Sequence, residues 1–111
     1  MVVDAEIIEA LASLNIPIFK WFDDYDGTFP AISYRLISST PVNFGDDKET
    51  DVNYIYQVSL ITENDDTDDL VKSIRSVMLA AGFTFISCDE LRDEKDFFIT
   101  AIRFYKTERE E

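Results

Sequence analysis

The spacing of apolar and polar residues along the chain predicts two helices. The first covers about residues 3–14, ends at Asn15, and has apolar residues at helical spacing: Ile7, Ile8, Leu11 and Leu14. The second has the clearest amphipathic pattern of the sequence, formed by Leu70, Val71, Ile74, Val77, Met78 and Ala81. Asp66 or Thr67 can cap its start, and Gly82 can end it in the left-handed conformation.

Runs rich in β-branched and aromatic residues predict five extended segments. A short segment at 16–22 precedes a long hairpin built from 31–40 and 53–62, and a second hairpin from 83–88 and 97–105 closes the pattern. In the long hairpin one face collects alternate residues of the second strand: Tyr54, Tyr56, Val58 and Leu60. The alternation is imperfect, because both faces of these strands carry apolar residues.

This order of elements predicts an α+β fold, with a mainly antiparallel sheet of about 4–5 strands and two helices packed on one face, in the order α-β-β-β-α-β-β. A chain of 111 residues is long enough for one domain with its own core, and we expect a single domain over 1–111. Two helices cover only one side of such a sheet. We therefore expect apolar residues on the other side to be covered by a partner.

The connection within the long hairpin, residues 41–52, is the most polar part of that hairpin. It holds twelve residues and four carboxylates, which is long for a connection inside a compact domain unless it has a use. We expect a flexible arm that contacts a neighbour or lines an opening, through Asp46, Asp47, Lys48, Glu49 and Asp51. A solubilising hairpin tip is the plainer alternative. The charged residues 107–111 are expected to form a frayed tail.

The charge balance limits the partners that this chain can have. The net charge is −13, and the ten cations are scattered along the sequence, which argues against specific binding to nucleic-acid phosphates. The first residues lack the basic and apolar parts of a secretion signal, and no apolar run approaches the roughly 20 residues that span a bilayer. A single cysteine fits a reducing compartment, so we expect a cytoplasmic site of synthesis and no membrane partner.

The sequence offers little chemistry for catalysis or for a cofactor. It contains no histidine, which is the usual base at neutral pH and the commonest metal ligand. The run Asp-Tyr-Asp-Gly at 24–27 lacks acids at both ends of a calcium loop, and the acidic clusters lie in predicted turns. Cys88 is expected to be a small buried hydrophobe, and Trp21 to fill a core or an interface without a cationic partner. We expect no enzyme, no cofactor and no metal.

Several short runs resemble the tail terminator proteins of long-tailed phages and prophages of Gram-positive bacteria, also called tail-completion or tail-to-head joining proteins. These runs are Phe-Pro-Ala-Ile-Ser-Tyr at 29–34, the polar hairpin arm, Met-Leu-Ala-Ala-Gly-Phe at 78–83 and Phe-Ile-Thr-Ala-Ile-Arg-Phe-Tyr at 98–105. The resemblance extends over nearly the whole chain and rests on element order and on aromatic and glycine positions. The acids of the arm have no residue-by-residue match in the family.

The resemblance implies a structural virion protein that is made in the bacterial cytoplasm and ends up in the phage tail. Such proteins cap the tail tube as a ring, usually of six copies, and join it to the head connector. The partners would be other copies of the chain, the tail tube protein and the connector, and DNA would pass through a negatively charged channel without binding. Since the same charge opposes ring closure, a monomer in isolation that forms rings only on the tail is an alternative. An alternative from another class is an acidic DNA mimic that inhibits a host DNA-binding enzyme, as anti-restriction proteins do.

Overall fold

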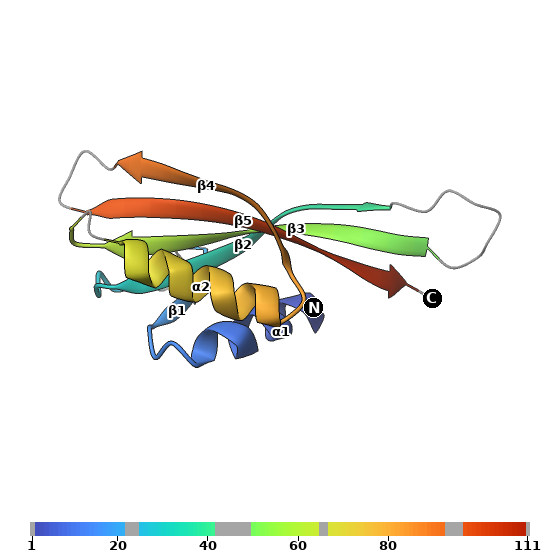
Figure 1. Ribbon diagram of the computed structural model, residues 1–111, viewed down its shortest axis with the longest axis horizontal. Helices are drawn as coiled ribbons and strands as arrows, with labels where there is room; N and C mark the ends of the chain where they lie inside the picture. The colour runs from blue at the N-terminus through green and yellow to red at the C-terminus, as the bar shows by residue number, and fades with distance from the viewer. Residues whose placement is uncertain (1, 22–24, 42–49, 65–66, 93–96, 111) are drawn as a thin grey trace.

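Two helices and five strands follow one another in the expected order α-β-β-β-α-β-β, and the α+β fold is confirmed (Figure 1). The computed structural model describes residues 2–21, 25–41, 50–64, 67–92 and 97–110. Its elements are α1 (Val2–Ala12), β1 (Ile18–Lys20), β2 (Ala31–Pro41), β3 (Thr50–Thr62), α2 (Asp68–Ala80), β4 (Thr84–Arg92) and β5 (Phe98–Glu110).

The strands form one mixed sheet in the order β1-β2-β3-β5-β4. Strands β2, β3, β5 and β4 pair antiparallel, whereas β1 pairs with β2 in parallel, with Ile18 opposite Ile32. The three residues of β1 form one edge of the sheet and the nine residues of β4 form the other. The pairing of β4 with β5 shifts between Phe85 and Ser87, which is a bulge close to the start of this second edge.

Both helices lie on one face of the sheet, where they enclose the core (Figure 1). The alternate β3 residues that were expected to share a face are all buried there. Helix α1 adds Val3, Ile7 and Leu11, which recur every fourth residue, and α2 adds Ile74 and Met78. The core therefore follows the apolar spacing of the sequence.

The ends of the two helices can be compared with the stop and cap residues that the sequence predicted. Asn15 has a φ of 57°, so it takes the left-handed conformation expected of a stop, three residues after α1 ends at Ala12. Gly82 has a φ of 96°, and the amides of Gly82 and Phe83 donate to the carbonyls of Leu79 and Met78. This is the Schellman pattern. Thr67 occupies the cap position of α2, but its side chain makes no capping hydrogen bond; Asp66 lies outside the described residues.

The ends of β2, β3 and β5 project beyond the helices, and the molecule is 52 Å long in this direction (Figure 1). The structure does not show the frayed tail that was expected at 107–111. Strand β5 continues to Glu110, whose register partner is Thr50. Ladder hydrogen bonds to β3 satisfy the backbone groups that water would satisfy in a frayed end. Of this tail, only residue 111 lies outside the described residues. We call the three-stranded part formed by 38–41, 50–55 and 105–110 the projection.

Candidate functional site

The arm predicted at 41–52 is only partly within the described residues. Pro41 ends β2 and Thr50 begins β3, so the two strands are longer than expected and the connection is shorter. Asp46, Asp47, Lys48 and Glu49 lie outside the described residues, and their role stays a prediction. Asp51 is half-buried in β3 and pairs in register with Arg109. The structure therefore places one of the five predicted residues in a strand of the projection.

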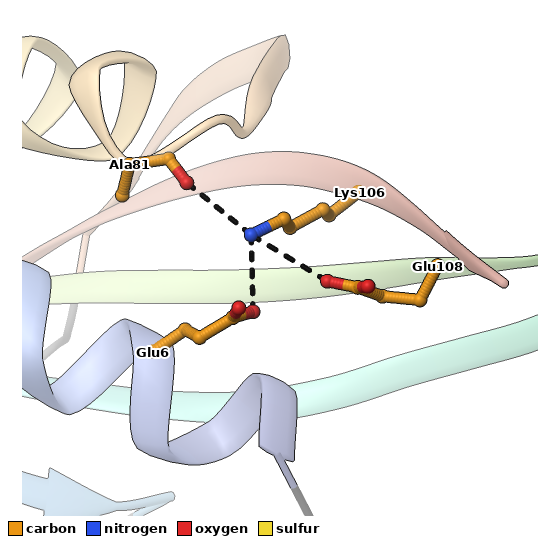
Figure 2. A network of polar contacts seen from close by, with 4 residues as sticks. All are labelled: Glu6, Ala81, Lys106 and Glu108. Carbon is orange, nitrogen blue, oxygen red and sulfur yellow. Dashed lines mark hydrogen bonds and ion pairs between the residues drawn. The ribbon is translucent and has the colours of Figure 1, made fainter.

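Lys106 anchors the base of the projection to both helices (Figure 2). Its ammonium group, Nζ, lies 3.0 Å from Glu6 Oε2 on α1, 3.5 Å from Glu108 Oε1 on β5, and 3.3 Å from the carbonyl oxygen of Ala81 after α2. It also lies 5.1 Å from the centre of the Phe83 ring. The lysine side chain is only 18% exposed, so these contacts are partly shielded from water.

This network could not be read from the sequence, because Glu6 and Ala81 are both far from Lys106 in the chain. Glu6 precedes Lys106 by 100 residues. Ala81 contributes a backbone carbonyl, one of those left without a helical partner at the end of α2, and a cation is favourable at that position. The lysine therefore joins α1, the end of α2 and β5 at the point where the projection leaves the helical layer.

A second polar cluster fixes the other side of α1 to the sheet. The hydroxyl of Tyr56, which is fully buried, donates a hydrogen bond to Asp4 Oδ1, and Lys20 of β1 lies 3.7 Å from Asp4 Oδ2. Burial raises the pKa of Tyr56 well above its ordinary value, and the hydrogen bond to Asp4 and its charge raise it further. The pKa of Tyr34 is also raised, first by burial and then by Asp4, while Lys20 opposes the shift.

The face of the sheet opposite the helices is less apolar than expected. Its central cross-strand rows are polar or small: Arg35, Gln57 and Arg103 form one row, and Ser33, Ser59 and Ala101 form the next. We call this side the open face; its arginines are exposed, whereas Ser33, Gln57, Ser59 and Ala101 are themselves buried. Apolar residues do occur in the rows on either side of these two, namely half-buried Ile55, Tyr105 and Ile99 and fully buried Ile61. The largest exposed apolar side chains, Ile8, Phe29, Leu36, Leu79 and Ile86, are spread over several elements.

The open face carries an aromatic and cationic contact that the sequence did not indicate. The guanidinium carbon of Arg35 lies 4.1 Å from the centre of the Trp21 ring, so the expectation that Trp21 has no cationic partner is wrong. Trp21 has a φ of 53° and directly follows β1, and its amide donates to the carbonyl of Tyr34 on β2. The parallel pairing of β1 with β2 brings the ring to Arg35, and sequence spacing does not reveal this pairing.

Within the part of the chain that the structure describes, no group of three or more acids and cysteines is arranged to hold a metal ion. Cys88 is exposed, which corrects the expectation of a buried residue; β4 is an edge strand with a neighbour on one side only. Desolvation raises the pKa of its thiol, and the charges of Asp89 and Glu90 add to the effect, so the reactive thiolate is disfavoured.

Among the described residues, no helix is long and apolar enough to cross a bilayer. What the geometry offers is surface for contact. It has a projecting three-stranded ribbon that is bound firmly at its base, and an open sheet face that displays aromatic and guanidinium groups. These groups are typical of protein interfaces.

Comparison with known proteins gives a likeness of fold. The chain is similar to a chain of the virion of a native gene transfer agent particle, with a TM-score of 0.53 and 12% identity. The match covers 88% of this chain and 82% of the other, so it includes nearly the whole domain. No protein-family model matches the sequence, and no curated protein matches it. At this identity the likeness shows a shared fold.

Proposed function

We propose that this chain is a structural, non-enzymatic virion protein that caps a phage tail tube as a ring and joins it to the head connector. The observation that carries the proposal is the likeness of fold to a chain of a gene transfer agent virion, over 88% of this chain. The resemblance of short sequence runs to tail terminators supplies the more specific role. Six copies are the usual number in that family.

The surface features of the described residues support an assembly role. A projection held by Lys106 and tied to both helices can reach a neighbour while the domain stays rigid. The net charge of −13 per copy would be multiplied around a ring. A ring lined by carboxylates repels phosphates, so DNA could pass through without sticking.

A DNA mimic needs carboxylates spaced like phosphates along one exposed surface. The exposed carboxylates of the described helices and strands are divided among α1, α2 and β4: Glu9, Asp68, Asp69, Asp89 and Glu90. This distribution does not favour the mimic, and the virion role is the one that we propose. Affinity capture from host lysate separates them, because a mimic would retain a DNA-binding enzyme and a terminator would retain tail or connector protein.

Deletion of the coding region in the phage or prophage that carries it tests the proposal directly. Electron microscopy of the lysate should show filled heads and unjoined tails, and expression of the chain in trans should restore complete particles. Tail length should also change, because a tube that lacks its cap is not terminated. Complete infectious particles from the deletion would contradict the proposed role.

The predicted arm is tested by exchanging its four carboxylates for the matching amides, as Asp46→Asn, Asp47→Asn, Glu49→Gln and Asp51→Asn. We expect the free energy of unfolding to change little and the joining of heads to tails, or DNA ejection, to be impaired. A control with Glu63→Gln, Asp68→Asn and Asp69→Asn removes three carboxylates near the start of α2. A normal infectious yield from the arm variant would remove the arm from the mechanism.

A further inference from the structure

Two arginines stand side by side on the open face, separated by one residue. In the sheet register Arg35 of β2 lies opposite Gln57 of β3, and Gln57 lies opposite Arg103 of β5. Direct partners in a sheet share a face, and strands are spaced about 4.8 Å apart, so the two arginine backbones are about 10 Å apart. The neighbouring β3 residues Tyr56 and Val58 are buried in the core, which places this row on the side away from the helices.

Both guanidinium groups are held in place by neutral partners. Arg35 stacks on Trp21 at 4.1 Å. Nε of Arg103 donates to Gln57 Oε1 at 3.3 Å, and Nε2 of Gln57 donates in turn to Ser59 Oγ at 3.0 Å. Each of these contacts leaves guanidinium N–H groups on an exposed side chain. No carboxylate of the described residues forms an ion pair with either arginine, although acids outnumber cations by 23 to 10 in the chain.

We propose that Arg35 and Arg103 form a docking site for the carboxylates of a second copy of this chain. A fixed, planar guanidinium group binds carboxylate or phosphate in a two-point contact. Phosphate of DNA is disfavoured by the net charge of −13, whereas every other copy brings 23 carboxylates. Trp21 and Tyr105, which flank the arginines on this face, add the aromatic groups that are enriched at interface centres.

The same charges determine the symmetry of the contact. If two open faces met, each pair of arginines would face the arginines of the other copy, and the like charges would repel. Contact with a different, acidic surface of the next copy avoids this repulsion. Such a head-to-tail contact continues from copy to copy and closes into a ring when the rotation allows. Only this ring geometry rests on the proposed function; the docking itself does not.

Charge reversal with a matched control tests the site. Sedimentation is followed up to about 1 mM protein at an ionic strength of about 0.15 M, where repulsion between whole copies is screened beyond about 8 Å. We expect the wild-type chain to associate, and the Arg35→Glu, Arg103→Glu variant to bind at least about tenfold more weakly. The control Lys72→Glu, Arg75→Glu makes the same change in net charge on α2 and removes a comparable stack, in which Arg75 lies 3.8 Å over Phe85. It should associate like the wild type.

Two results of this experiment would overturn the inference: association that the double reversal leaves unchanged, or a wild-type chain that stays monomeric up to about 1 mM. Circular dichroism on each variant shows whether the fold is kept. If the double reversal fails to fold, the lysine variants described next decide the question alone. The deletion experiment is independent, so unjoined tails together with unchanged association would refute the docking site and leave the proposed function standing.

Zero-length cross-linking identifies the acidic side of the contact. Arg35→Lys and Arg103→Lys keep the positive charge and supply an amine that a carbodiimide couples to a carboxylate in contact with it. Mixed isotope-labelled and unlabelled copies distinguish links between chains from links within one chain. We expect links between chains from residues 35 and 103, and fewer from the control Arg75→Lys. Equal yields from all three positions would refute the docking site.

Discussion

Replacement of Lys106 with methionine should destabilise the fold by about 2 kcal/mol. Methionine keeps most of the aliphatic stem beside Phe83 and Gly82 but removes the charge that contacts Glu6, Glu108 and the carbonyl of Ala81. A hydrogen bond to a charged group contributes about 1.5–3 kcal/mol when shielded, and an exposed ion pair about 0–1 kcal/mol. Glu6 and Glu108 are 33% and 35% exposed, so we take a value near the lower end of the first range for the whole network.

The assay is urea denaturation at neutral pH, followed by far-ultraviolet circular dichroism. Loss of any cation increases the self-repulsion of a chain with a net charge of −13, so the control is Lys72→Met, which removes an exposed lysine from α2. We expect that control to cost less than about 0.5 kcal/mol. Glu6→Gln should cost about 0.5–1 kcal/mol, and its effect should shrink when Lys106 is already methionine.

The reasoning would be refuted if Lys106→Met and Lys72→Met lowered the free energy of unfolding equally. Their equality would mean that net charge, and not the local network, accounts for the loss. Repetition at about 0.5 M salt sharpens the comparison, because salt screens the repulsion between distant charges more than it screens the shielded contacts of Lys106.

Three further variants probe other parts of the structure. Tyr56→Phe removes the donor to Asp4 and should cost about 1–2 kcal/mol. Because the raised pKa keeps Tyr56 protonated in the fold while unfolded tyrosine ionises near pH 10, stability should fall above about pH 10 in the wild type and fall less in this variant, in urea titrations at each pH. Gly82→Ala should destabilise the fold by about 1–2 kcal/mol through its positive φ alone, since the new methyl group meets only the Lys106 side chain at ordinary contact distance. Gly27→Ala is its control, because Gly27 also has a positive φ but no neighbour within 4 Å. We expect the two variants to lower the melting temperature equally. Cys88 should react with iodoacetamide more slowly than a free cysteine at pH 8, and Asp89→Asn with Glu90→Gln should speed the reaction; an unchanged rate would contradict the part of the pKa shift assigned to these acids.

Local signals in the sequence predicted the elements and the core. Gly82 ended α2 as expected, because a positive φ is a local requirement that glycine satisfies best. The alternation through Tyr56 and Val58 identified the buried face of β3, because one face of a strand packs on the helices. These features depend on residues that are close together in the chain, so the sequence alone was enough to predict them.

Features that depend on distant pairing could not be predicted in the same way. Residues 108–110 are charged, and only their pairing with the start of β3 makes them a strand. Trp21 reaches Arg35 through a parallel pairing between β1 and β2, and Cys88 is exposed because β4 lies at the sheet edge. The candidate arm is the least determined part of the site. Of its five predicted charged residues only Asp51 falls within the described part of the chain, where it belongs to a strand.

The acidic side chains on the exposed edge of the nine-residue strand β4 have a consequence for aggregation. The outer edge of β4 has no partner among the described strands, and a strand edge of that length is a template for uncontrolled stacking of chains. Asp89 and Glu90, exposed on that margin, together with the bulge before Ser87, act as gatekeepers against it. Concentrated solutions of the protein should consequently aggregate more readily at acidic pH, where these carboxylates lose their charge.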